Sequence, residues 1–334
     1  MNRGRVLFSV LILLTTSGFA QIQDISSFNF LRVPGNARLA ALGGVNVSLA
    51  DRDLNLFFSN PTLISDTLND FASASYQFYV GGVNQAVFSY GHKSNKVGMV
   101  GFGVQHISYG TIKSYDATGA AIGDFNSGET SLVISKSHQV GHFRFGANLN
   151  VAFSSIAGYR ATAVLLDVGG LFVHPKKNLT VGLAMKNMGV VLSDYTNSSN
   201  SKLPIDIQLG ATFKPQHMPL RFSITGYNLV NSYNVYQNSQ DTKKPGALDK
   251  VLRRFNFATE VLIHRNVNLM IGYNYRQHQE LKLPNGGGGA GISLGFSAKV
   301  KAAEFVFSRS GFVAGKASYT FTVLVNTQKI FIRR

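Results

Sequence analysis

The chain has 334 residues, of which 32 are Lys or Arg and 16 are Asp or Glu, so its formal charge is +16. It contains no cysteine, which excludes disulfides, thiolate metal sites and cysteine nucleophiles. The basic excess indicates an anionic partner, and for an exported chain lipid phosphate or acidic polysaccharide fits better than nucleic acid. After the first twenty positions no apolar run reaches 18 residues, which argues against membrane-spanning helices.

The first twenty residues have the pattern of a secretory signal peptide. Two arginines lie in the first five positions, an apolar run follows to Leu14, and Gly18 and Ala20 form a small-x-small cleavage site. We therefore expect export, and a mature chain that begins near Gln21.

A period of two in hydrophobicity recurs along the rest of the chain. In residues 142–153, HFRFGANLNVAF, apolar residues alternate with mostly polar ones, which indicates a strand with one apolar face. Fourteen segments are predicted as strands, each close to the roughly 9 to 11 residues with which a tilted strand crosses a bilayer. They lie at 70–79, 82–91, 96–107, 127–138, 141–154, 161–174, 177–188, 204–214, 219–228, 252–264, 267–277, 290–300, 303–313 and 316–327.

The connections between these segments alternate in length. The long ones, at 108–126, 189–203, 229–251 and 278–289, all follow odd-numbered segments. Outer-membrane barrels place short turns on one rim and long loops on the other. We therefore predict an all-β fold, a transmembrane outer-membrane β-barrel of about 14 antiparallel strands at residues 67–330. A hatch segment at residues 21–66 precedes it, and the expected location is the outer membrane of a Gram-negative bacterium.

The free-energy cost of placing a charged side chain in lipid decides which face of each strand points outward. A closed barrel leaves no unpaired backbone edge in the hydrocarbon layer. The apolar face of residues 143–153 is expected to contact acyl chains, and Arg144, Asn148 and Asn150 the lumen, because an arginine that faces mid-membrane lipid costs roughly 2 to 4 kcal/mol. The segment at 161–174 is apolar on both sides, so its faces stay unassigned.

The stretch at 28–64 lacks strand periodicity and carries a distinctive motif. The motif residues are Phe28, Phe30, Leu31, Pro34, Ala37, Arg38, Ala41, Leu42, Gly43, Gly44, Asn46, Val47, Ser48, Asp51, Asp53, Asn60 and Pro61. Together they resemble the opening motif of the PorV/PorQ group, whose members are outer-membrane components of the type IX secretion system and are similar to FadL-type fatty-acid transporters. Residues 109–125 resemble the same group more weakly.

The resemblance is strongest to the PorQ-type members, and it implies a barrel with a hatch in its lumen and a non-enzymatic anchoring role. The implied partner is a PorZ-like surface protein, held beside the sortase PorU and the barrel PorV. That attachment complex links secreted cargo to anionic lipopolysaccharide in the outer membrane. The implied structural positions of the hatch are Pro34, Arg38, Gly43, Gly44, Asp51, Asp53, Asn60 and Pro61.

Two acidic residues of the motif, Asp51 and Asp53, suggest a clamp. We expect them to hold the hatch against inward-facing arginines such as Arg144 or Arg254, because unpaired charge in a dry lumen is costly. A solvated turn is the alternative interpretation.

The long connections offer contacts for a surface partner, since Tyr is a common interface anchor. The alternative function is FadL-like transport of hydrophobic molecules. The polar inward-facing residues disfavour it, although Phe57 and Phe58 would suit a small pocket. The candidate partner contacts are Tyr109, Tyr115, Tyr195, Tyr233 and Tyr236.

Enzymatic motifs are weak. Ser293 lies in GISLG, a match to G-x-S-x-G, but it falls inside an alternating strand and no His follows it, so no nucleophile elbow is expected. The eight His residues are scattered without metal-ligand spacing. We expect no enzyme activity, no cofactor and no metal.

Overall fold

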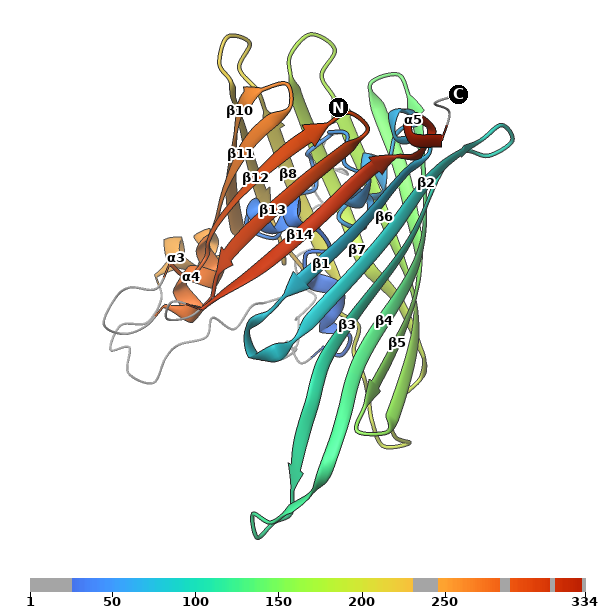
Figure 1. Ribbon diagram of the computed structural model, residues 1–334, viewed down its shortest axis with the longest axis vertical. Coiled ribbons are helices and arrows are strands. Elements are labelled where there is room, and N and C mark those ends of the chain that lie inside the picture. Colours follow the sequence, from blue (N-terminus) through green and yellow to red (C-terminus); the bar gives the residue numbers. More distant parts are fainter. Residues whose placement is uncertain (1–25, 231–245, 283–288, 313–315, 332–334) are drawn as a thin grey trace, which may run out of the picture.

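Fourteen antiparallel strands close into a barrel in which β1 pairs with both β2 and β14. The computed structural model describes residues 26–230, 246–282, 289–312 and 316–331, so the expected signal peptide lies outside the described residues. Figure 1 shows the barrel from the side. The strands are β1 Phe71–Phe78, β2 Asn84–Ser94, β3 Gly98–Tyr115, β4 Ala121–Val140, β5 Phe143–Ile156, β6 Tyr159–Val173, β7 Leu179–Ser193, β8 Asp206–Phe213, β9 Leu220–Gly226, β10 Phe255–His264, β11 Val267–Asn274, β12 Ile292–Val300, β13 Ala303–Gly311 and β14 Ala317–Asn326.

The two rims differ as the sequence predicts. We call the rim with the connections after even-numbered strands the short-turn rim, and the rim with those after odd-numbered strands the long-loop rim. The short turns lie at 95–97, 141–142, 174–178, 214–219, 265–266 and 301–302. Helix α5 lies at the short-turn rim, and α3 and α4 lie at the long-loop rim (Figure 1). The number of strands and the sorting of connections are therefore confirmed.

The outer surface of the barrel is a belt of exposed apolar side chains. In β5, Phe145 is 57% exposed and Leu149 is 51% exposed, whereas the alternate residues Asn148 and Asn150 are buried. The predicted assignment of faces is therefore confirmed, and Arg144 lies on the inward side near the short-turn rim. Other belt residues are Phe88, Phe102, Leu132, Ile134, Leu183, Leu209, Leu294, Phe296 and Phe321.

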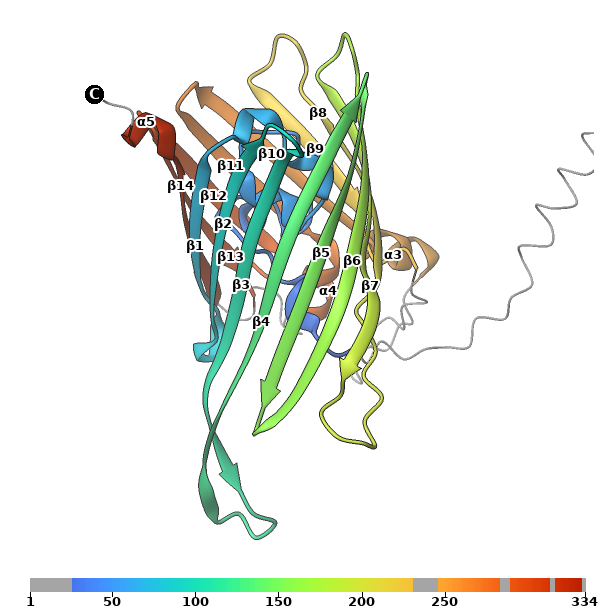
Figure 2. The ribbon, with the colours of Figure 1, turned by 90° about the vertical axis from the view of Figure 1, so that its right-hand side faces the viewer.

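The β3–β4 hairpin corrects one prediction. The expected long loop at 108–126 is sheet, because β3 and β4 stay paired as far as Tyr115 and Ala121. Asp116 closes the hairpin by accepting hydrogen bonds from the backbone N–H groups of Thr118 and Ala120, both at 2.9 Å. The hairpin projects beyond the rest of the long-loop rim (Figure 2). Strands pair through backbone hydrogen bonds, which form between polar strands as well as between apolar ones. The loss of apolar alternation therefore did not mark the end of the sheet.

The helices are short, and most of them belong to the N-terminal segment, which we define as residues 26–69. No helix within the described residues, in this segment or elsewhere, is long and apolar enough to cross a membrane. Figures 1 and 2 show this segment, in blue, inside the barrel. The helices are η1 Asn29–Arg32, α2 Ala37–Ala41, η2 Leu54–Phe58, η3 Pro61–Leu63, η4 Asp66–Leu68, η5 Val80–Gly82, α3 Ala247–Leu252, α4 Tyr275–Leu281 and α5 Thr327–Phe331.

The N-terminal segment explains why β6 is apolar on both sides. Leu165 faces inward and is 1% exposed, while its neighbour Leu166 faces outward and is 43% exposed. Leu165 shares a buried cluster with Phe28 and Phe30 of the N-terminal segment. The inner face of β6 is therefore a protein core at this point, and its apolar residues are buried without facing lipid.

Candidate functional site in the barrel lumen

Polar side chains give the N-terminal segment its local shape. The Asn36 side chain caps α2 by accepting a hydrogen bond from Leu39 N–H at 2.8 Å, and Asp53 caps η2 by accepting one from Asn55 N–H at 3.0 Å. Asn60 accepts from Thr62 N–H at 3.1 Å, with Pro61 at the first position of η3. Short helices with side-chain caps leave few backbone donors unsatisfied at their starts. The segment therefore folds as a chain of single turns.

The barrel wall supplies donors to backbone carbonyls of the segment. Asn256 of β10 donates from Nδ2 to both Leu42 O, at 2.7 Å, and Val45 O, at 2.8 Å. Such bonds matter because a buried carbonyl left without a donor costs about 1 to 3 kcal/mol. Further wall donors to segment carbonyls are Gln105 to Phe30, Ser137 to Ile64, Asn148 to Phe57, Thr180 to Ser48, Asn274 to Gly43 and Ser310 to Ala40.

Glycines on the inner wall let the segment approach the strands closely. A Cβ atom added at Gly182 of β7 would lie 2.2 Å from Val47 O, and one added at Gly272 of β11 would lie 2.2 Å from Gly43 N. Both distances are far below van der Waals contact, so these positions admit only glycine while the segment is in place.

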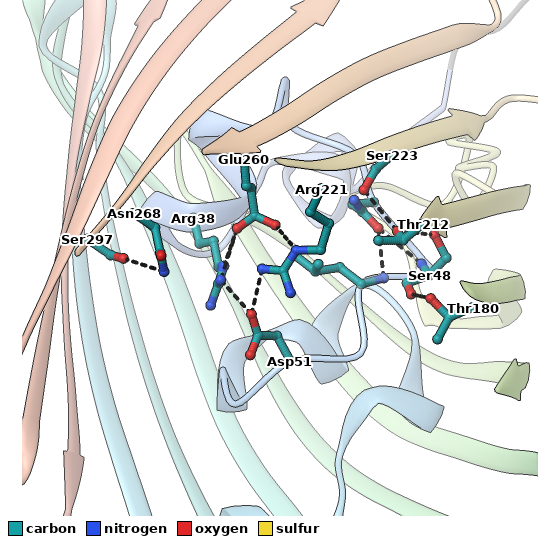
Figure 3. Close-up of polar contacts among 12 residues, drawn as sticks. Arg38, Ser48, Asp51, Thr180, Thr212, Arg221, Ser223, Glu260, Asn268 and Ser297 are labelled. Atoms are coloured by element: carbon teal, nitrogen blue, oxygen red, sulfur yellow. Dashed lines mark hydrogen bonds and ion pairs between the residues drawn. The ribbon is translucent and has the colours of Figure 1, made fainter. Parts of the chain in front are cut away.

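Four charged side chains form a closed ring between the segment and the wall (Figure 3). Arg38 Nη2 is 2.7 Å from Asp51 Oδ2 and 2.9 Å from Glu260 Oε1. Arg221 Nη2 is 2.6 Å from Asp51 Oδ2, and Arg221 Nε donates to Glu260 Oε2. Arg38 and Asp51 belong to the N-terminal segment, whereas Arg221 lies in β9 and Glu260 in β10. The ring carries no net charge, and it connects the two parts of the chain.

The two acidic residues of the motif differ in electrostatics. Burial acts to raise the pKa of Asp51, but the Arg38 and Arg221 guanidinium groups overcome it and hold this pKa well below its usual range. Burial raises the pKa of Asp53 to about 6, and the positive charge of Arg38 offsets this rise only in part. The expectation of a clamp through an inward-facing arginine therefore fits Asp51, but the proposed partners were wrong. Arg144 bonds Gln139 instead.

The partners were wrong because strand register decides which inward residue meets the segment. Arg254 lies just before β10, where its Nη1 is 3.5 Å from Leu229 O. Arg221 and Glu260 are direct cross-strand neighbours, and both appear in the sequence as isolated charges at inward positions. Their opposite signs in adjacent predicted strands are a signal of pairing, but every strand offers inward polar residues, so this signal does not single out the partners of the segment.

The remaining motif positions cluster near a lumen cavity. Pro34, Gly43 and Gly44 line it, and the two glycines have φ of 85° and 88°, which a turn with left-handed backbone requires. Asn60 lies deeper, where its Nδ2 donates to Val47 O at 2.8 Å. All eight predicted motif positions thus lie in the segment inside the barrel.

The predicted tyrosine contacts divide into three groups. Tyr109 and Tyr195 face inward, where their hydroxyls donate to Glu129 and to Ser154 Oγ. Tyr115 is 57% exposed near the tip of the β3–β4 hairpin. Tyr233 and Tyr236 lie outside the described residues.

A cavity of about 500 Å³ lies in the lumen between the N-terminal segment and the long-loop rim. Its apolar lining includes Leu31, Val33, Val45 and Phe58 from the segment. The wall contributes polar and charged groups, including Lys186 and Asp206. The expectation that Phe58 lines a pocket is met, whereas Phe57 is fully buried in the core beside it.

The closed barrel, its apolar belt and its filled lumen define the class of protein: an outer-membrane-type β-barrel. No protein-family model matches the sequence, and comparison with curated protein sequences yields no match. Solved structures do match. A TodX monoaromatic hydrocarbon channel with a deltaS2 mutation has 12% identity and a TM-score of 0.53, with 88% of this chain and 98% of that chain covered.

Two further structures point the same way. The TodX deltaS2S3 mutant has 12% identity and a TM-score of 0.54, with 90% of this chain and 98% of that chain covered. A FadL homologue from Pseudomonas aeruginosa has 11% identity and a TM-score of 0.50, with 87% and 98% covered. At such low identity the likeness concerns the fold alone, which is that of FadL-type outer-membrane barrels.

Proposed function

We propose that this chain is a FadL-like outer-membrane transporter that takes small hydrophobic molecules into its lumen. The observation that carries the proposal is the cavity of about 500 Å³, in which apolar side chains of the N-terminal segment face a mostly polar barrel wall. Its size lies within the range of roughly 300 to 1,000 Å³ that is typical of small-molecule pockets. The similar TodX structures are monoaromatic hydrocarbon channels, which supports the same class of substrate here.

In this proposal the N-terminal segment acts as the hatch. It fills the lumen on the short-turn side of the cavity, where the ion ring and the wall donors hold it. A molecule that enters from the long-loop rim reaches the cavity, and it passes further only when the segment shifts. The ion ring is the contact that such a shift has to break.

The proposal is tested by entry of N-phenylnaphthylamine, which fluoresces on reaching membrane interior, into intact Gram-negative cells that express the protein. Val45 lines the cavity, and Val45→Trp should fill part of it and slow entry severalfold. Val190 is 60% exposed on the outer surface, so Val190→Trp is the matched control and should leave entry unchanged. Equal entry with and without the protein, or with both variants, would refute transport.

A second candidate is an anchoring role at the cell surface, and the projecting β3–β4 hairpin favours it. The hairpin, which projects beyond the rest of the long-loop rim (Figure 2), contains the exposed apolar residues Ile112, Tyr115 and Ile122. Exposed apolar side chains at the tip of a long hairpin suit a protein partner. We propose that the partner in this role is a PorZ-like surface protein beside PorU and PorV in a type IX attachment complex, with lipopolysaccharide nearby.

Anchoring is tested by affinity capture from detergent-solubilised native membranes. Ser108 and Gly128 are cross-strand partners, so residues 109–127 can be replaced by a two-residue Asn-Gly turn while the rest of the sheet stays paired. The full-length barrel should retain a surface protein that the shortened barrel loses. Tyr115→Ser should weaken the same capture. Retention of the same proteins by both barrels would refute the hairpin as an anchor.

A further inference from the structure

We propose that the outer face of β8–β11 binds one anionic phospholipid, with an acyl chain in an apolar groove and the phosphate on basic residues of the short-turn rim. The site is separate from the lumen cavity, because its apolar half faces outward into the belt. It does not depend on what the barrel transports.

The apolar half is a groove of about 400 Å³ on the belt. Ala211 of β8 and Thr259 of β10 are the small outward-facing residues, and larger side chains flank them on the same and neighbouring strands. An acyl chain in such a groove contacts protein on several sides, whereas a lipid against a flat wall contacts it on one. The flanking residues are Phe213, Phe222, Ile224, Phe257, Ile271 and Tyr273.

The polar half lies where the same strands end. Phe213 faces the belt, and the next residue, Lys214, begins the β8–β9 turn. Lys214 and Arg265 lie close together at this rim, because both line a hollow of about 610 Å³ whose lumen side is formed by Asp51, Arg221 and Asn268. Asp51 is already paired within the ion ring, so the turn residues keep a local positive charge.

The neighbouring turns extend the basic region. Backbone hydrogen bonds join the turns, from Lys214 N to Asn178 O and from Lys299 N to Asn266 O. Residues 174–179, 214–219, 264–267 and 299–302 contain six Lys or Arg and no Asp or Glu. Across the described ranges none of these six forms an ion pair, whereas the long-loop rim pairs Arg253 with Asp249 and Arg276 with Glu280.

Charge and position together identify the occupant. The groove belongs to the exposed apolar belt, so its surroundings are lipid, and the rim lies at the level where the belt gives way to polar residues. Lysine and arginine at that level attract anionic headgroups. A neutral lipid would fill the groove but leave the basic turns without a partner, so the site selects an anionic phospholipid.

The test is native mass spectrometry of the purified barrel, released from neutral detergent after titration with phosphatidylglycerol or phosphatidylcholine of the same chain length. Phosphatidylglycerol should be retained more tightly. In the Lys214→Gln, Arg265→Gln double variant, each substitution should lower the ratio of phosphatidylglycerol to phosphatidylcholine affinity about fivefold. This factor corresponds to roughly 1 kcal/mol per basic side chain. Lys113→Gln with Lys202→Gln, on the long-loop rim, is the matched control and should keep the preference.

A second variant separates the groove from the headgroup contact. Ala211→Phe fills the groove and should weaken retention of both lipids, and Thr259→Leu does the same with a smaller change if the first variant fails to fold. Equal retention of the two lipids by the unaltered protein would show binding of any acyl chain only, and would overturn the proposal. Unchanged phosphatidylglycerol retention in the groove variants or in the double variant would overturn it as well.

Discussion

The ion ring predicts how firmly the N-terminal segment is held, and Glu260→Gln is the sharpest perturbation of it. Glu260 is 1% exposed and bonds both arginines of the ring. The substitution keeps the shape of the side chain but removes its charge, and Arg38, which is 3% exposed, is left with Asp51 alone. Removing the charge of one partner in a buried ion pair lowers stability by about 3 to 5 kcal/mol, because the other charge is left buried without its partner. Since Asp51 still holds both arginines, we expect the lower figure, about 3 kcal/mol, which corresponds to a factor of roughly 150 in the open population.

The assay uses the absence of native cysteine. Ser48→Cys places the protein's only thiol in the segment, at a site that is 0% exposed. Its maleimide reaction rate then follows the population in which the segment has left the wall. Glu260→Gln in this background should raise the rate about 150-fold. Asp66→Asn breaks the exposed Lys93–Asp66 pair, whose side chains are 47% and 64% exposed, so it should change the rate by no more than about fivefold.

One result would refute the reasoning about the ring. If Glu260→Gln and Asp66→Asn gave the same labelling rate, the ring would contribute no more than a surface pair, and the wall donors alone would hold the segment. Charge reversal offers a check: Arg221→Glu together with Glu260→Arg restores the pair within the wall but places like charges beside Asp51 and Arg38. This double variant should therefore label at least as fast as Glu260→Gln.

Three further outcomes are expected. Because burial raises the folded-state pKa of Asp53 to about 6, above its unfolded value of 3.8, its ionisation opposes folding and stability falls as pH rises from about 4 to 6. Asp53→Asn should remove this slope and add roughly 3 kcal/mol near neutral pH, measured by denaturant titration in detergent. Gly182→Ala should release the segment in the labelling assay, since its Cβ would meet a segment carbonyl, whereas Gly170→Ala, with nothing within 4 Å, should not. Leu149→Arg, on the middle of the belt, should cost about 2 to 4 kcal/mol of unfolding free energy in bilayers, and Val140→Arg, beside a short turn, about 0 to 1 kcal/mol.

Much of the barrel follows from sequence because strand periodicity is local. The alternation of Phe145, Asn148, Leu149 and Asn150 assigns both faces of β5 without any knowledge of neighbouring strands. Turn lengths likewise sort the connections between the rims. The same local rule failed at 108–126, where β3 and β4 continue into water and apolar alternation stops before the pairing does.

The site was harder to predict because its contacts join residues that are far apart in the chain. Arg38 meets Glu260 across 222 positions, and Arg221 meets Asp51 across 170. The motif around Arg38 and Asp51 was visible in the sequence, but its wall partners were not, since every strand offers inward polar residues.

The sequence by itself determined the class of fold, the number of strands, the lipid-facing side of most of them and the rim on which the long connections lie. These depend on period, length and turn residues within about a dozen positions. Only the tertiary structure decided how the N-terminal segment is seated, which charges close the ring, where a cavity remains and why β6 is apolar on its inner side. Those features depend on register around a closed barrel, where a shift of one residue turns every side chain to the opposite face.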